Sequence, residues 1–322
     1  MFNTSRVLYS LLVNAACVLA AGIAAAQDYP NKTITIVIPQ GPGGASDLVP
    51  RSLAPGLSKI LGQTVVVENK ASANNLIGYE YVARQAPADG YTLLQITDTT
   101  HPILPLITKD IRFSPLQDLT PVAFLAESRL VLSSSLQEPW QNLKEMVAYA
   151  KANPGKLNYG SSSASTRLQT EWITRTLGIN VVYIPYKTTG AGTTAIVSRE
   201  ANMGMMAEGL AVGLRDRLRV LAVTGDKRSK AFPDVPTFEE QEVPQMKNFT
   251  IGLTVRTGTP RAAIDKLNSA IAQALKQSEV RGQFVKVEVE AVDMPSPAAA
   301  QHLAQRARFF AEIARQIGLQ PE

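Results

Sequence analysis

Short apolar runs alternate with longer amphipathic segments along the first third of this chain. Residues 34–38 are apolar except at Thr35 and are followed by Pro39, which is typical of a strand covered on both faces. In order, we predict strands over 34–38, 64–68 and 91–96 and helices over 48–61 and 77–85. This βαβαβ order predicts an α/β fold with a mostly parallel, doubly wound sheet.

A second α/β unit follows a long extended segment over 120–133. Its predicted elements are helices over 143–152, 168–177 and 191–199 and strands over 157–159, 181–184 and 220–224. The chain is extended again over 249–255, and two helices follow at about 261–277 and 297–317. We therefore predict domain 1 from residues 27–124 plus 250–322 and domain 2 from residues 125–249. Two crossing segments favour a hinge, with a ligand cleft between two doubly wound lobes.

The first 26 residues have the pattern of a cleaved export signal. Arg6 supplies a positive charge, residues 7–23 are mostly apolar, and three alanines fit a cleavage site near Ala26. A membrane span is a weaker interpretation, because the run is interrupted and no stop-transfer charges follow it. Cys17 is the only cysteine and lies in this segment, so the mature chain lacks thiolate sites and disulfides. We expect a periplasmic protein without a cofactor.

The charged and titratable residues exclude several classes of function. The formal charge is +5 at pH 7, but the basic residues are scattered, so no nucleic-acid partner is predicted. The two histidines, His101 and His302, have no neighbours at metal-ligand spacing, and His302 is predicted to lie on the surface. No nucleophile elbow or phosphate loop occurs, and the turn at 41–46 lacks the last glycine of a dinucleotide fingerprint. The sequence therefore predicts neither a metal site nor catalytic machinery.

The strongest candidate for binding is the glycine-rich turn after the first strand. Its glycines permit positive φ and close approach of the backbone to a ligand, and Ser46 and Asp47 are suitable N-caps for the helix predicted over 48–61. Backbone N–H groups and a helix N-terminus converging at one point suit an anion. The alternative is a turn that only caps a helix. The candidate residues are Gly41, Pro42, Gly43, Gly44, Ala45, Ser46 and Asp47.

Four further polar loops, at 71–75, 97–101, 159–167 and 185–190, follow predicted strands. Open α/β sheets bind ligands at such strand ends, although each loop could be an ordinary polar turn. Arg167 can hold a carboxylate with two parallel hydrogen bonds, and the alternative is a solvated arginine at a helix start. The candidate residues in these loops are Asn75, Thr97, Thr99, Ser161, Ser163, Arg167 and Tyr186.

Several short segments occur in an order that is far more specific than any one of them. They are YPNKTITIVIP at 29–39, PGGASD at 42–47, LGQTVVVEN at 61–69, DGYTLL at 89–94, NPGKLNYGS at 153–161, IPYK at 184–187, FPDVPT at 232–237 and Gly258-Thr-Pro260. Over the whole mature chain, this pattern resembles the Bug (Bordetella uptake gene) family, the periplasmic solute-binding proteins of tripartite tricarboxylate transporters. The resemblance implies a type II periplasmic binding protein fold. It also implies a carboxylate gripped by backbone groups of Gly41 to Asp47.

The sequence departs from the family pattern where the far end of a ligand would lie. The family has Pro-Gly-Ala-Gly-Gly where this chain has Ala71-Ser-Ala-Asn-Asn75, and Tyr-Lys-Gly where it has Tyr186-Lys-Thr188. The serine-rich loop is about two residues shorter and lacks its glycines. A histidine usual in the family is missing, and Arg167 or Gln169 occupies its region.

The resulting hypothesis is a monomeric receptor, not an enzyme, that closes on a small mono- or dicarboxylate and delivers it to a membrane permease. Gly43, Gly44, Ala45 and Ser46 would hold the proximal carboxylate, and Arg167 with Thr97, Ser161 and Ser163 the distal group. Two alternatives stay open: a receptor that presents its ligand to a sensor kinase, and an exported α/β enzyme.

Overall fold

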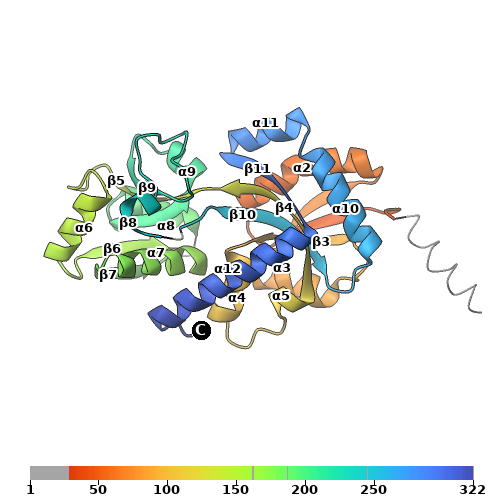
Figure 1. The fold of residues 1–322 in the computed structure, drawn as a ribbon, viewed down its shortest axis with the longest axis horizontal. Coiled ribbons are helices and arrows are strands. Elements are labelled where there is room, and N and C mark those ends of the chain that lie inside the picture. Colours follow the sequence, from red (N-terminus) through yellow and green to blue (C-terminus); the bar gives the residue numbers. More distant parts are fainter. Residues whose placement is uncertain (1–28, 162, 187, 245, 322) are drawn as a thin grey trace, which may run out of the picture.

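The structure, a computed structural model, describes residues 29–161, 163–186, 188–244 and 246–321. It consists of two mixed α/β lobes, each built on its own sheet and joined by long strands (Figure 1). The predicted architecture, two α/β lobes joined by two crossing strands, is thereby confirmed. The export signal predicted for residues 1–26, with its cleavage site and Cys17, lies outside the described residues.

The first lobe contains a six-stranded sheet with the order β11-β4-β10-β3-β1-β2. The strands are β1 (Ile34–Ile38), β2 (Val65–Asn69), β3 (Thr92–Thr97), β4 (Leu119–Ser128), β10 (Phe249–Arg256) and β11 (Val289–Pro295). β1 pairs in parallel with β2 and β3, as predicted, whereas β10, β4 and β11 pair antiparallel. The prediction of a mostly parallel sheet therefore holds for only half of this sheet.

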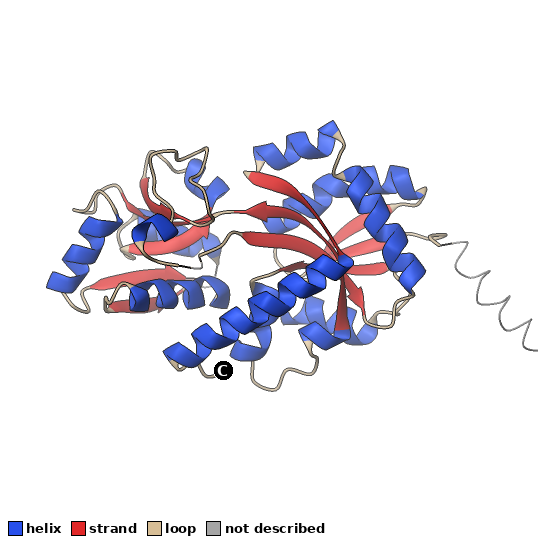
Figure 2. Ribbon diagram, in the orientation of Figure 1, coloured by secondary structure: helices blue, strands red, loops and turns tan. Residues whose placement is uncertain are grey.

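Helices cover both faces of that sheet (Figure 2). Ile36 and Ile38 pack on one side with α2 (Ala45–Leu61), α10 (Arg261–Ala274) and α11 (Ser278–Lys286), and Val37 packs on the other. The helices of the first lobe's other face are α3 (Leu76–Glu80), which continues as a π-helical turn over Tyr81–Gln85, α4 (Thr100–Ile107), α5 (Pro115–Asp118) and α12 (Ser296–Ile317). Burial on both faces explains why β1 reads as an almost unbroken apolar run.

The second lobe contains a five-stranded sheet with the order β7-β6-β8-β5-β9. Its strands are β5 (Leu130–Ser135), β6 (Leu157–Ser161), β7 (Val181–Pro185), β8 (Met203–Ala207) and β9 (Leu218–Val223). Its helices are α6 (Leu143–Ala152), α7 (Ala164–Thr176), α8 (Thr189–Val197) and α9 (Glu208–Val212), with a 3-10 turn over Glu239–Gln241.

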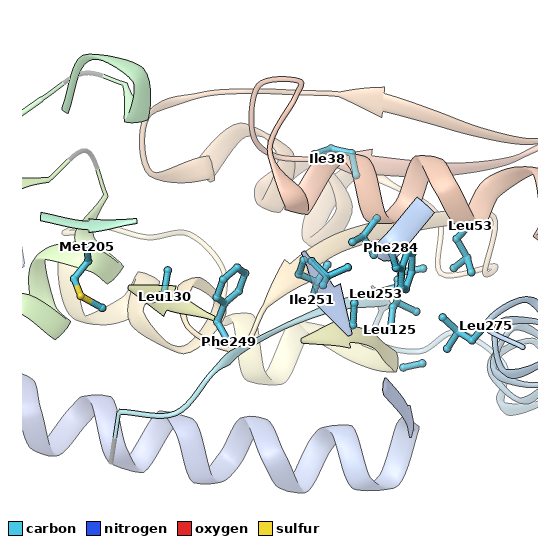
Figure 3. Close-up of a cluster of buried hydrophobic side chains, with 14 of the residues drawn as sticks. Ile38, Leu53, Leu125, Leu130, Met205, Phe249, Ile251, Leu253, Leu275 and Phe284 are labelled. Carbon is cyan, nitrogen blue, oxygen red and sulfur yellow. The ribbon is translucent and has the colours of Figure 1, made fainter. Parts of the chain in front are cut away.

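Two segments connect the lobes, as the sequence predicts. β4 passes through Arg129 directly into β5, and β10 returns the chain to the first sheet (Figure 1). Figure 3 shows Leu130, Phe249 and Ile251 along these crossing strands, with Met205 of the second lobe beyond them. One apolar core therefore runs through the connection between the lobes.

Helix α12 is tied to the crossing strand by a buried polar cluster. The carboxylate of Asp98 accepts hydrogen bonds from the backbone N–H of Thr250 at 2.8 Å, contacts His302 Nε2 at 2.8 Å and pairs with Arg306 Nε at 3.2 Å. His302, predicted to lie on the surface, is only partly exposed, because its ring packs on Phe124 and faces this buried carboxylate. Further along α12, Phe310 and Ile313 pack with Leu168 of α7, so α12 contacts both lobes.

Several boundaries differ from the predictions. α2 begins at Ala45 instead of residue 48, and α7 begins at Ala164 instead of residue 168, because Gly44 and Ser163 are the N-caps. α4, α5, α9, α11, β8 and β11 were not predicted from the sequence. No helix in the described part of the chain has the length and apolarity needed to cross a membrane.

Candidate functional site

The turn between β1 and α2 presents backbone donors at the start of a 17-residue helix. The carbonyl of Gly44 accepts the first helical bonds from Asp47 and Leu48, both at 2.9 Å. Within the described residues, nothing accepts from the N–H groups of Ala45 and Ser46. Gly43 has φ +100°, a conformation that side chains rarely allow, and an added Cβ would meet nothing within 4 Å. The turn therefore has the geometry of an open anion site.

Asp47 is not the N-cap of α2, contrary to the prediction. Its side chain instead stabilises the turn by accepting hydrogen bonds. The side chain is buried in the first turn of α2 and accepts from the N–H of Gly43 at 3.0 Å, Arg51 Nε at 3.0 Å and Asn69 Nδ2 at 2.9 Å. Burial acts to raise the pKa of Asp47, but the bonds from Arg51, Asn69 and Gly43 hold it below its usual value. The structure thus turns both oxygens toward protein donors.

The strand order places this turn at the switch point of the first sheet. β1 lies between β2 and β3, so the loops at the carboxyl ends of these strands gather at one edge. Thr97 and Thr99 come from the β3–α4 connection, but both are buried and their hydroxyls lie 3.0 Å apart. The Thr97 hydroxyl also accepts from the N–H of Thr100 at 3.0 Å. These two candidates shape the loop through bonds inside it.

The serine-rich loop of the second lobe ends in a capped helix start. Ser163 is the N-cap of α7 and accepts from the N–H of Thr166 at 3.2 Å. The hydroxyl of Ser161 donates to the carbonyl of Ser163 at 2.9 Å and is buried. Ser161 therefore holds the loop in shape, whereas Ser163 lines a pocket between the lobes.

Arg167 lies in the first turn of α7 and lines the same pocket. Its Nε donates to Glu171 at 2.9 Å, and its guanidinium carbon lies 4.6 Å from the ring centroid of Tyr183. The hydroxyl of Tyr159 donates to the same Glu171 oxygen at 3.1 Å. These contacts fix the guanidinium in the pocket wall, where its planar set of donors suits a carboxylate.

The pocket combines residues from both lobes. It is lined by Asn74, Ile107, Ser163, Ala164, Arg167, Leu168, Tyr183, Tyr186, Leu319 and Gln320. Of the predicted site residues, it contains Ser163, Arg167 and Tyr186. The hydroxyl of Tyr186 donates to Glu200 at 3.1 Å. Asn75 lies beside Asn74, and both have left-handed backbone conformations. The sequence prediction missed the C-terminal residues Leu319 and Gln320, which no local pattern connects with a binding loop.

A second cavity lies beside the crossing strands, between α9 and the α11–β11 connection. Glu208, the first residue after β8, lines it together with Arg129, Glu288 and Glu290. Burial raises the pKa of Glu208, and Glu288 and Glu290 add to that effect against the opposing influence of Ser229 and Arg129. The ionised form of Glu208 is therefore disfavoured at this position beside the crossing strands.

Comparison with known proteins identifies the family to which this chain belongs. Residues 49–319 match the model of the tripartite tricarboxylate transporter family receptor. The chain belongs to this family. The protein BugT of Bordetella pertussis is 32% identical over 313 residues, which are 94% of this chain and 95% of BugT. The predicted similarity to the Bug family is therefore confirmed.

Two solved structures that are similar to this one contain small dicarboxylates. R. palustris Rpa4515 with adipate has a TM-score of 0.83 and 26% identity, covering 92% of this chain and 100% of its own. MatC from Rhodopseudomonas palustris with bound malate has a TM-score of 0.79 and 26% identity, covering 89% and 100%. The matching family model describes a transporter receptor.

Proposed function

We propose that this protein captures a small carboxylate, preferentially a dicarboxylate, between its two lobes. The observation that carries the proposal is the β1–α2 turn, which presents the N–H groups of Ala45 and Ser46 at the N-terminus of α2. A fixed donor array at a helix N-terminus favours a stable anion over a neutral ligand. The malate and adipate held by structurally similar proteins support the same chemical class.

The proximal carboxylate lies at Gly43, Gly44, Ala45 and Ser46, and Arg167 receives the distal group. Each hydrogen bond to a charged group contributes roughly 1.5–3 kcal/mol. Three or four such bonds, reduced by the loss of ligand and side-chain freedom, give a binding free energy of about −8 kcal/mol, or a micromolar Kd. No covalent step is required, because capture needs only matched donors and a cleft that closes.

The biological role follows from capture. The signal at residues 1–26 directs the chain to the periplasm, where the protein acts as a monomer and delivers the ligand to the membrane permease of a tripartite tricarboxylate transporter. The family match supports this role. Uptake of the labelled ligand into permease-containing membrane vesicles should depend on added protein, and uptake that is independent of it would contradict delivery.

A thermal-shift screen of the mature protein tests the proposal. The protein is unfolded and refolded first to remove any carried-over ligand, and is then scanned against aliphatic, aromatic and amino-acid carboxylates. A ligand at about 100 times its Kd should stabilise the folded state by roughly 2.7 kcal/mol. We expect stabilisation by dicarboxylates and none by the matching diamines. Absence of any shift across the carboxylates would refute the proposed function.

A further inference from the structure

The loop between β2 and α3 has an unusual backbone. Asn74 and Asn75 have φ values of 51° and 67°, in the left-handed region that glycine adopts most readily. Asparagine tolerates this region better than most residues, because its short polar side chain can hydrogen-bond locally. Each position therefore combines a backbone that glycine would satisfy with an amide that glycine lacks.

This loop is attached to the anion-binding turn. Asn69, the last residue of β2, donates from Nδ2 both to the carbonyl of Gln40 at 2.9 Å and to Asp47 at 2.9 Å. Gly78 of α3 packs so closely on Pro39 that an added Cβ would lie 2.8 Å from the proline Cβ. The loop that holds Asn74 is thus held next to the end of β1.

Asn74 contributes to the pocket from the first lobe, and Arg167 contributes from the second. A third wall comes from the C-terminus, where Gly318 has φ +70° and the N–H of Leu319 donates to the carbonyl of Ala314 at 2.9 Å. This C-terminal turn reverses the chain, so that Leu319 packs on the cluster of α4, α7 and α12 and Gln320 lines the pocket. The pocket is therefore lined by polar residues from both lobes, and Leu319 and Gln320 of the C-terminal turn form its third side.

We propose that Asn74 is a specificity-determining residue that reads the second carboxylate of a linear dicarboxylate, together with Arg167, in a subsite closed by Leu319 and Gln320. The inference rests on the proposed function and adds the residue that selects dicarboxylates over monocarboxylates. The amide NH2 of Asn74 donates to the distal carboxylate from the first lobe while Arg167 donates from the second. One ligand group then bridges the lobes, which couples recognition to closure.

The experiment compares Asn74→Gly and Asn74→Asp with the wild type by calorimetric titration. The probes are saturated α,ω-dicarboxylates of four to eight carbons and monocarboxylates of equal length. Glycine fits the left-handed backbone, and aspartate also tolerates it, so both variants should fold with near-wild-type melting temperatures. Glu242→Gly is the matched control, because Glu242 also has positive φ (62°) and lines neither pocket.

Asn74→Gly should weaken dicarboxylate binding about tenfold or more and change monocarboxylate binding less than threefold, as expected for loss of one bond to a charged group. Asn74→Asp should weaken dicarboxylates further through like-charge repulsion, and Glu242→Gly should change neither class. An unchanged ratio of dicarboxylate to monocarboxylate affinity in both Asn74 variants overturns this inference alone. Failure of the wild type to bind any carboxylate overturns the proposed function and this inference with it.

Discussion

Replacement of Asp47 by asparagine removes a buried negative charge while nearly preserving the volume of the side chain. In the structure, Oδ2 accepts from the N–H of Gly43, and Oδ1 accepts from Arg51 and Asn69. An asparagine has only one acceptor oxygen, so its NH2 group must face a donor on one side or the other. Either the bond from the N–H of Gly43 is lost, which frees the turn from α2, or the bonds from Arg51 and Asn69 are lost, which removes the link between Asp47 and β2.

The expected loss of stability depends on how deeply these bonds are buried. Bonds to a buried charge are each worth roughly 1.5–3 kcal/mol, but Arg51 is 39% exposed, so its part is screened by solvent. We expect Asp47→Asn to destabilise the protein by about 2–3 kcal/mol, which lowers the melting temperature by roughly 3–5 °C for a chain of this size. Thermal unfolding followed by circular dichroism measures the change.

The pH dependence gives an independent check. The pKa of Asp47 is lowered in the folded state, so its ionised form contributes stability above the pKa of the unfolded chain, about 3.9. That contribution is lost as the pH falls through the folded pKa. The difference between wild type and Asp47→Asn should be constant from about pH 6 to 8 and should shrink below about pH 4.

The matched control is Asp265→Asn, which removes an exposed ion pair of the same spacing, with Arg261, on α10. Such exposed pairs contribute little, so no measurable change in melting temperature is expected. Equal stability of Asp47→Asn and wild type at pH 7 would refute the assigned role of Asp47 in holding the turn.

Three further predictions concern the turn, the pocket and the hinge. Gly43→Ala forces a side chain into φ +100° and should weaken carboxylate binding at least tenfold in calorimetry. Gly44→Ala should change binding far less, because Gly44 has an ordinary φ and open space around it. Equal effects of the two substitutions would contradict the turn geometry. Arg167→Ala should weaken dicarboxylates more than monocarboxylates, and equal losses would exclude contact with a second carboxylate. The pKa of Glu208 is raised in the folded state, so its ionised form opposes folding above that pKa. Glu208→Gln should therefore raise the melting temperature at pH 8, and this gain should fade toward pH 4. No gain at pH 8 would show that the charge is tolerated.

The sheet strands that read as apolar runs could be predicted from the sequence. β1 and β10 are buried along nearly their whole length, and their β-branched and aliphatic residues mark them clearly. The glycine-rich turn was recognisable for the same local reason, since strand, glycines and helix follow in sequence. The two crossing segments were visible because each is an extended stretch between α/β units.

The elements that were missed have weaker local signals. α4 contains Pro102 and Pro105 and begins in a run of threonines, so its sequence resembles a loop, yet packing of Ile103 and Leu104 in the core holds it helical. β8 is a short methionine-rich strand without the alternation of a half-buried strand. Tertiary packing decided the structure in both places.

The pocket walls depend on contacts between distant parts of the chain. Asp98 meets His302 across 204 positions, and Gln320 reaches a pocket that also contains Asn74. Such pairings form because α12 packs against both lobes. No local spacing in the sequence predicts that packing. The chemistry of Arg167 was evident from its residue type, but its contact with Glu171 and Tyr183 followed only once α7 was seen to start at Ala164.

A crystal structure of the protein with the linear dicarboxylate that gives the largest thermal shift would show whether one ligand spans the β1–α2 turn and the pocket. We predict one carboxylate at the N–H groups of Ala45 and Ser46 and the other within hydrogen-bonding distance of Arg167 and Asn74. A dicarboxylate bound with neither end at the β1–α2 turn, for example in the cavity beside Glu208, would contradict it.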